Sequence, residues 1–391
     1  MDDRLIMTLK ENPQENFERI LYWQHLVLKL IGVDGFGADF RRSAITYFFV
    51  FLAGLFFVIS VIDLVLFRQD IFNFTFVMVT IFYALVGFGR LSILVRRAAA
   101  AAPLVQHMKT VYRDASRDPK ETLILQTYTN YLEKSVIFYS VIFMGGVVLT
   151  GFLPLAVYLW TGNKILPFGV VIPFVDPETP DGYQMNYMYQ VSFMLWTPPG
   201  LIASQSFYFA LSFNICIQFD VLVVKLQGVD NLIANNVNGS LDGEIRTNLI
   251  TVIKYQQRLV QFISDLEDLY AFQTFLEVAC NALQIVMTLF VLHIEFWFPG
   301  WLVITVSTFQ LFLPCMLGTM IEIKCDLFIE QVYDISWHAM SNVEQKMLNF
   351  MLTKSQRTQK LSCVGMVPLN MNLFLAVYKK IYSIFMMLQN L

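Results

Sequence analysis

The sequence predicts an all-α membrane protein with seven transmembrane helices, a cytoplasmic N-terminus, an extracellular C-terminus and a cytoplasmic helical anchor region. Composition is the first observation that predicts it. The 391 residues are 56% hydrophobic and only 15% charged, whereas a typical soluble domain is about 25% charged. The second observation is that the basic residues are distributed unevenly between the two sides of the predicted membrane.

Seven apolar runs are long enough to cross the roughly 30 Å of hydrocarbon in a bilayer, which takes about 20 helical residues. We predict spans at 44–66, 72–95, 133–160, 188–215, 272–296, 301–323 and 365–388. Residues 1–43 are mixed and charged, so we expect the first span itself to act as the insertion signal.

The basic residues set the predicted orientation. Of the 27 Lys and Arg residues, 23 lie in the N-terminal segment and in the second, fourth and sixth connections, Arg90 among them. The three other connections hold only Arg68 and Lys164, and Lys379 and Lys380 lie inside the last span. Because basic residues concentrate on the cytoplasmic side, the N-terminus is predicted inside and the C-terminus outside. A G-protein-coupled receptor has the opposite orientation.

Several connections have a predicted structure of their own. Apolar residues at helical spacing predict an interfacial or packed helix around 17–30, and more helix is expected from 96 to 131. The outer connection 161–187 carries Pro167, Pro173, Pro177 and Pro180, which favour an ordered lid over a helix.

Helical apolar stripes continue beyond the fourth, fifth and sixth spans. The first two stripes contain Phe219, Leu222, Val223, Leu226, Leu249, Val252, Ile253, Leu259, Phe262, Ile263, Leu266 and Leu269. Such stripes are buried if several helices bundle below the membrane. The alternative is that the helices lie on lipid headgroups, which the interleaved acidic residues disfavour. We therefore predict a helical base on the cytoplasmic side, with residues 324–364 contributing to it.

The outer halves of the spans combine aromatic residues, methionines, glycines and helix-interrupting prolines. This combination predicts a pocket for a small, largely apolar molecule among the first six spans, within residues 44–323. Ordinary packing and lipid contact are the alternative for each residue taken singly. Ser140, Thr150, Thr197 and Ser204 could orient a ligand. The predicted ligand-binding residues are Phe76, Tyr83, Ser140, Phe143, Met144, Val147, Phe193, Met194, Trp196 and Trp297.

The last segment, 365–391, is predicted to line an ion path. Two adjacent lysines inside hydrocarbon cost several kcal/mol, and neighbouring helix positions point about 100° apart, so at least one should face water or a partner. A protein–protein seam is the alternative. Beyond them an apolar cluster predicts a dewetting gate. The predicted pore and gate residues are Lys379, Lys380, Phe385, Met386 and Gln389.

No catalytic, metal-binding, cofactor or nucleic-acid motif is present in the sequence. The four histidines are scattered, and the five cysteines (216, 280, 315, 325 and 363) fall in spans or on the inner side, where they are predicted to be packing residues. Asn73 begins a glycosylation sequon at the outer edge of the second span.

A series of residues in the C-terminal quarter is more specific. It contains Tyr333, Asp334, Trp337, Leu348, Met351, Leu352, Ser355, Gln356, Arg357, Gly365, Pro368, Leu369, Asn370, Phe374, Val377, Tyr378, Lys379, Tyr382 and Ser383. This series, with the inverted seven-span pattern, resembles the insect odorant receptor family.

The resemblance implies a heterotetrameric, odorant-gated, non-selective cation channel, built from a tuning subunit and a shared odorant receptor co-receptor (Orco). It implies that the seventh span lines the pore and that cytoplasmic helices anchor the subunits, here through Tyr333, Trp337, Leu348 and Leu352. The connection from Lys225 to Lys254 is too short for the co-receptor's insertion, so the chain resembles a tuning subunit. The implied location is the plasma membrane of olfactory sensory neuron dendrites.

Two other classes share part of this pattern. An insect gustatory receptor has the same architecture, but its usual final-span signature ends in Gln-Phe, whereas Gln389 is followed by Asn390. A secondary transporter should show paired half-repeats with broken helices, and only the fourth span has a Pro-Gly break.

The orientation is directly testable. Epitope tags fused before residue 1 and after residue 391 should be stained differently on intact cells, with only the C-terminal tag accessible, because of the basic-residue asymmetry. Permeabilised cells, in which both tags should stain, are the control. External staining of the N-terminal tag would contradict the orientation.

Overall fold

Helices account for nearly all of the computed structural model, which describes residues 12–30, 32, 44–236, 239–295, 297–356 and 360–389. Seven of the described helices are long and apolar enough to cross a membrane, which confirms the predicted number of spans. They are α3 (Ala44–Leu66), α4 (Ile71–Arg96), α6 (Pro119–Thr161), α7 (Pro180–Ala234), α8 (Asp242–Ile294), α9 (Phe298–Asp334) and α11 (Met371–Gln389).

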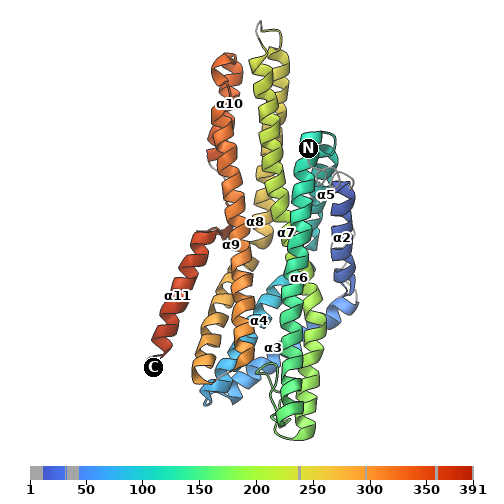
Figure 1. Ribbon diagram of the computed structural model, residues 1–391, viewed down its shortest axis with the longest axis vertical. Coiled ribbons are helices and arrows are strands. Elements are labelled where there is room, and N and C mark those ends of the chain that lie inside the picture. Colours follow the sequence, from blue (N-terminus) through green and yellow to red (C-terminus); the bar gives the residue numbers. More distant parts are fainter. Residues whose placement is uncertain are drawn as a thin grey trace.

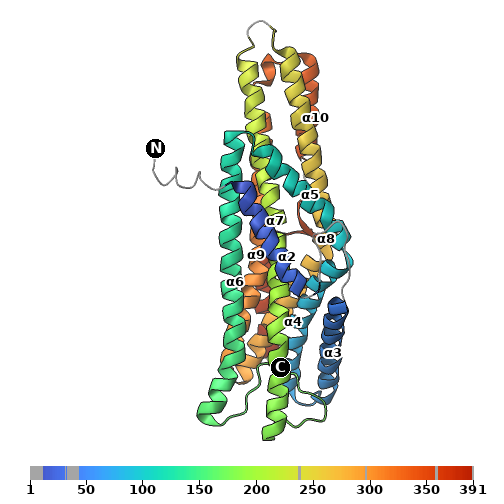
Figure 2. The same cartoon turned by 90° about the vertical axis from the view of Figure 1, so that its right-hand side faces the viewer.

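Four of these helices are longer than a bilayer requires. α7 has 55 residues and α8 has 53, so each is about 80 Å long at roughly 1.5 Å per residue. One half of each helix crosses the membrane-facing bundle and the other half continues beyond it. Figures 1 and 2 show these halves of α7 and α8 rising beside α10 (Asn342–Gln356) at one end of the molecule.

The projecting halves form a packed helical base. The apolar stripes of α7 and α8 are buried there, with Leu222, Leu249 and Leu266 fully covered, and Met351 of α10 packs into the same core. Of the two alternatives for these stripes, the structure therefore shows bundling. A short 3₁₀ helix, η1 (Trp337–Ala339), connects α9 to α10.

Two further helices pack against the side of the bundle. α2 (Pro13–Leu30) and α5 (Ala98–Ala115) lie next to each other and to α7 (Figure 2). Phe17 of α2 stacks on Tyr112 of α5 with ring centroids 4.0 Å apart, and Leu28 is fully buried. These contacts show that the helix expected around 17–30 is packed on the protein, while Tyr22 and Trp23 remain exposed on its other face.

Local signals define where the helices begin and end. Asp70 accepts a hydrogen bond from the Asn73 backbone N–H at the start of α4, and Thr179 caps Gly182 at the start of α7. Such caps satisfy amides that have no partner within a helix. α6 ends at Gly162, whose positive φ of 73° suits a glycine.

The seventh span begins later than predicted. Residues 365–370 are not helical, because β1 (Ser362–Cys363) and β2 (Val367–Pro368) form a small antiparallel hairpin ahead of α11. After this hairpin, the backbone carbonyl of Leu369 approaches α9 so closely that a Cβ on Gly318 would collide with it. The start of α11 is therefore fixed against α9, and Figure 1 shows the rest of α11 at the edge of the bundle.

Candidate functional site

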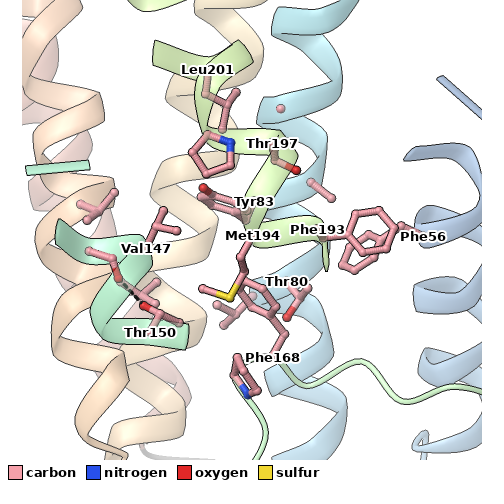
Figure 3. Close-up of a pocket in the computed structure, with 18 of the residues that line it drawn as sticks. Phe56, Thr80, Tyr83, Val147, Thr150, Phe168, Phe193, Met194, Thr197 and Leu201 are labelled. Carbon is pink, nitrogen blue, oxygen red and sulfur yellow. Dashed lines mark hydrogen bonds between the residues drawn. The ribbon is translucent and has the colours of Figure 1, made fainter. Parts of the chain in front are cut away.

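A cavity of about 180 Å³ lies within the membrane-facing half. Its wall is formed by residues of α3, α4, α6, α7, α8 and α9 and by the loop between α6 and α7. Figure 3 shows Tyr83 and Met194 reaching towards the middle of the cavity from α4 and α7, with Phe168 of the loop at one end. The wall is almost entirely apolar, as in most small-molecule sites.

Most of the predicted ligand-binding residues lie on this wall. They are Phe76, Tyr83, Phe143, Val147, Phe193, Met194 and Trp297. Ser140 and Met144 are not among the lining residues: the Ser140 hydroxyl donates to the Val136 carbonyl at 2.7 Å, and Met144 is 41% exposed on the outside of α6. The side chain of Trp196 lies outside the described part of the chain.

Sequence reasoning missed other parts of the wall. Phe56, Thr80 and Leu201 line the cavity but were not predicted to do so. Thr150 and Thr197, which were predicted to orient a ligand, also line it. Periodicity alone could not separate these side chains from lipid-facing ones, because both kinds are apolar and recur at helical spacing.

The loop between α6 and α7 closes one end of the cavity. Pro167 and Phe168 line the cavity, and Gly169 passes so close to Phe76 that a Cβ there would lie 2.7 Å from that ring. The loop is non-helical from 162 to 179, which agrees with a lid, although the predicted range to 187 includes the first turns of α7.

Three buried polar side chains hold this loop in place. Gln190 accepts from the Phe168 N–H at 2.7 Å and donates to the carbonyls of Phe168 at 3.1 Å and Val170 at 2.6 Å. Asp63 accepts from the Val171 N–H at 2.8 Å, and Asn186 from the Ile172 N–H at 2.6 Å. A loop without secondary structure thus satisfies its backbone groups inside an apolar bundle.

An ion pair lies at the other end of the cavity. Arg90 of α4, a cavity-lining residue only 1% exposed, donates from Nε to Glu277 of α8 at 2.6 Å and from Nη1 to the Tyr139 hydroxyl at 3.2 Å. Gln273 also donates to Glu277, at 2.7 Å. The count of basic residues placed Arg90 in a cytoplasmic connection. The structure shows instead that Arg90 is buried within α4.

The predicted pore residues all lie on α11. Lys379 and Lys380 are exposed on the face turned away from the bundle, and Met386 and Gln389 are exposed as well. Ile381 is buried against Ile285 and Val286 of α8. These positions leave one long face of α11 uncovered by this chain.

The predicted anchor residues are divided between surface and core. Tyr333 and Trp337 are 70% and 50% exposed, so they are free to meet a partner, whereas Leu348 is buried and Leu352 is partly buried within the base. All five cysteines are buried, and none of them forms a disulfide. No group of three or more His, Cys, Asp or Glu side chains suited to a metal occurs in the described part of the chain.

The fold and the site together define a membrane protein with seven spanning helices and an apolar cavity among them. The family model described as 7tm Odorant receptor matches residues 70–382. The match covers most of the sequence, and the chain belongs to the odorant receptor family.

Individual relatives agree with this assignment. The chain is 26% identical over 248 residues to putative odorant receptor 83c of Drosophila melanogaster, a match that covers 61% of this chain and 62% of that protein, less than two thirds of its length. It is 23% identical over 310 residues to odorant receptor 10 of Aedes albopictus, covering 77% of this chain and 80% of that protein.

The fold also matches a solved structure, the insect olfactory receptor OR5 from Machilis hrabei in complex with eugenol. The TM-score is 0.83 at 12% sequence identity, covering 97% of this chain and 100% of the other. At that identity the match shows a shared fold. It confirms the all-helical, seven-span architecture.

The hydrogen bonds of Gln190 to the loop are testable. Gln190→Leu should leave one amide and two carbonyls of the loop without partners, at a cost of about 1–3 kcal/mol. We expect hydrogen–deuterium exchange of the Phe168 amide, which donates to Gln190, to become about 5- to 150-fold faster. Gln227→Leu, at an exposed position of the same helix, is the matched control. Unchanged exchange in Gln190→Leu would show that the loop is held by other contacts.

Proposed function

We propose that this chain is the odorant-binding tuning subunit of a heteromeric, odorant-gated, non-selective cation channel. A small volatile binds in the cavity of the membrane-facing half, and its binding opens a pore lined by α11. The observation that carries the proposal is the cavity itself, which is apolar, lined by six helices and the loop, and located in a chain of the odorant receptor family.

The size of the cavity supports a small ligand. An engineered apolar cavity of about 150 Å³ in another protein binds benzene, so 180 Å³ suits a molecule somewhat larger than benzene. Dispersion and the removal of apolar surface from water supply most of the binding free energy in such a site. Volatile odorants, being small and largely apolar, have these properties.

Contacts along α8 and α9 support a connection between the cavity and the pore helix. Gln284 lines the cavity, and the next residues, Ile285 and Val286, pack on Ile381 of α11. Ser307 lines the cavity, and the adjacent Thr308 shares a hydrogen bond with the Tyr378 hydroxyl of α11. A ligand that shifts either helix therefore acts directly on the contacts of α11.

The uncovered face of α11 supports assembly with other subunits. Exposed lysines at 379 and 380 are costly against lipid tails, so a water-filled path shared with partner subunits is the environment that suits them. We propose that the co-receptor (Orco) supplies those partners in a heterotetramer, with Tyr333 and Trp337 at the contact surface of the base. The acidic residues Asp176, Glu178 and Asp181 near the outer mouth favour cations.

The proposed location follows from the same argument. A multi-pass membrane protein that detects odorants acts in the plasma membrane, and we place it in the dendrites of olfactory sensory neurons. The family match favours an odorant receptor over a gustatory receptor channel.

Substitutions in the cavity wall test the binding proposal. Met194→Ala removes a side chain that packs 3.5 Å from the position a Cβ would take on Gly151, and the lost contact should cost about 1–3 kcal/mol. We expect the effective odorant concentration to rise by about 5- to 150-fold, with surface expression intact. Met144→Ala, outside the cavity on α6, is the matched control. Identical dose–response curves for both variants and the wild type would contradict the proposal.

Cysteine accessibility tests the pore. A thiol reagent applied from outside should modify cysteines placed at Met386 or Gln389 and reduce the current, because these positions lie on the uncovered face of α11. A cysteine at Ile381, buried against α8, is the matched control. The native cysteines are buried, so their background reaction should be low. If neither position reacts, and Lys379→Gln leaves conductance and selectivity unchanged, α11 of this subunit does not line the pore.

A further inference from the structure

The guanidinium of Arg90 has a hydrogen-bonding group that the protein does not use. Nε donates to Glu277 and Nη1 donates to Tyr139. Nη2 is buried and has no acceptor among the described residues. Because an arginine presents five N–H donors and accepts none, the unused nitrogen can be satisfied only by an acceptor. An unsatisfied buried donor is costly, so an acceptor arriving there gains binding free energy.

This unused donor belongs to a residue that lines the ligand cavity. Arg90 shares the wall with Gln284, which is also buried and whose side-chain oxygen has no partner among the described residues. Gln284 follows Glu277 by two helical turns and so lies on the same face of α8. A largely apolar cavity thus has two unpaired polar groups, one donor and one acceptor, on the wall formed by Arg90 and Gln284.

The charge on that wall is already balanced. Glu277 neutralises Arg90 at 2.6 Å, with Gln273 also donating to the carboxylate. A ligand carboxylate would add an uncompensated negative charge inside an apolar bundle, where burying a charge is costly. A pure hydrocarbon would leave Nη2 without an acceptor. Both extremes of polarity are therefore disfavoured.

We infer that the cavity selects a neutral ligand with an oxygen that accepts a hydrogen bond from Nη2 of Arg90, as the carbonyl of a ketone does. The inference rests on the proposed function and specifies its ligand class. The rest of the ligand is apolar and fills the cavity between Tyr83, Met194 and the loop. Arg90 is then a specificity-determining residue, and Glu277 and Tyr139 position its guanidinium.

A second unpaired donor in the cavity, the indole N–H of Trp297, is the main alternative to Arg90. The indole Nε1 of Trp297 also lines the cavity, is buried and has no partner among the described residues. Hydrogen bonds from a charged donor are roughly twice as strong as those from a neutral one. The stronger selectivity for an oxygen acceptor is therefore assigned to Arg90.

The test compares ligands that differ in a single group. Ketones such as acetophenone are paired with alkenes in which a methylene replaces the oxygen, α-methylstyrene in this case, and benzoate represents the carboxylates. Binding to the purified full chain is measured from the rise of its melting temperature with ligand concentration. Currents of the same chain co-expressed with the co-receptor are recorded in parallel. Binding without current would contradict the channel function but not the ligand class.

We expect each ketone to bind at least about tenfold more tightly than its alkene, and benzoate not to bind. Arg90→Met combined with Glu277→Gln removes the donor and the charge together while keeping an acceptor for Gln273, and should abolish the preference for ketones. Tyr139→Phe, which weakens the same network but keeps Nη2, should retain the preference.

Four results would overturn the inference. They are equal binding of ketone and alkene, tightest binding of benzoate, absence of ketone binding by a chain that responds to other volatiles, and a ketone preference that survives the double substitution but is lost in Trp297→Phe. The melting temperatures of the unliganded variants report whether they fold. If the double variant does not fold, the ratio of ketone to alkene binding in the wild type and in Trp297→Phe still decides the inference.

Discussion

Backbone hydrogen bonding along α7, α8 and α9 is the constraint on which the rest of this structure depends. Inside a bilayer an unpaired backbone group costs several kcal/mol, so a chain that crosses it must be helical or closed into a barrel. Here the same helices continue into the base, and the apolar stripes that make the base coherent are direct continuations of the spans. The membrane-facing bundle and the base are consequently one rigid framework, in which the cavity has a defined shape.

Some of the polar groups buried in that framework have a clear structural role. Asp63, Asn186 and Gln190 allow a non-helical loop to pack over the cavity, because they supply the partners that lipid cannot. Arg90 and Glu277 bind α4 to α8, and removing one partner would leave the other as an uncompensated buried charge. The two ends of the cavity are therefore held by hydrogen bonds, while its sides are held by packing.

The cavity and the pore helix share their supporting elements. Successive residues of α8 and α9 face the cavity and then α11, as at Gln284 with Ile285 and at Ser307 with Thr308. Gly318 brings α9 against the start of α11 without an intervening side chain. Only the start and one face of α11 are fixed in this way, so its remaining face is available to partner subunits and can respond to movements of the two helices.

The sequence by itself determined the seven spans and the helical base, because apolar length and helical period are local properties, and it named a minority of the residues that line the cavity. It also placed a proline-rich loop over a pocket. Tertiary structure alone decided which apolar side chains face the cavity: Phe143 and Met144 are adjacent in the same apolar helix, yet only Phe143 lines it. Likewise, Arg90 has the sequence context of a basic residue at the edge of a span. Its meeting with Glu277, 187 positions away, depends on how α4 packs on α8, and no local pattern records that contact.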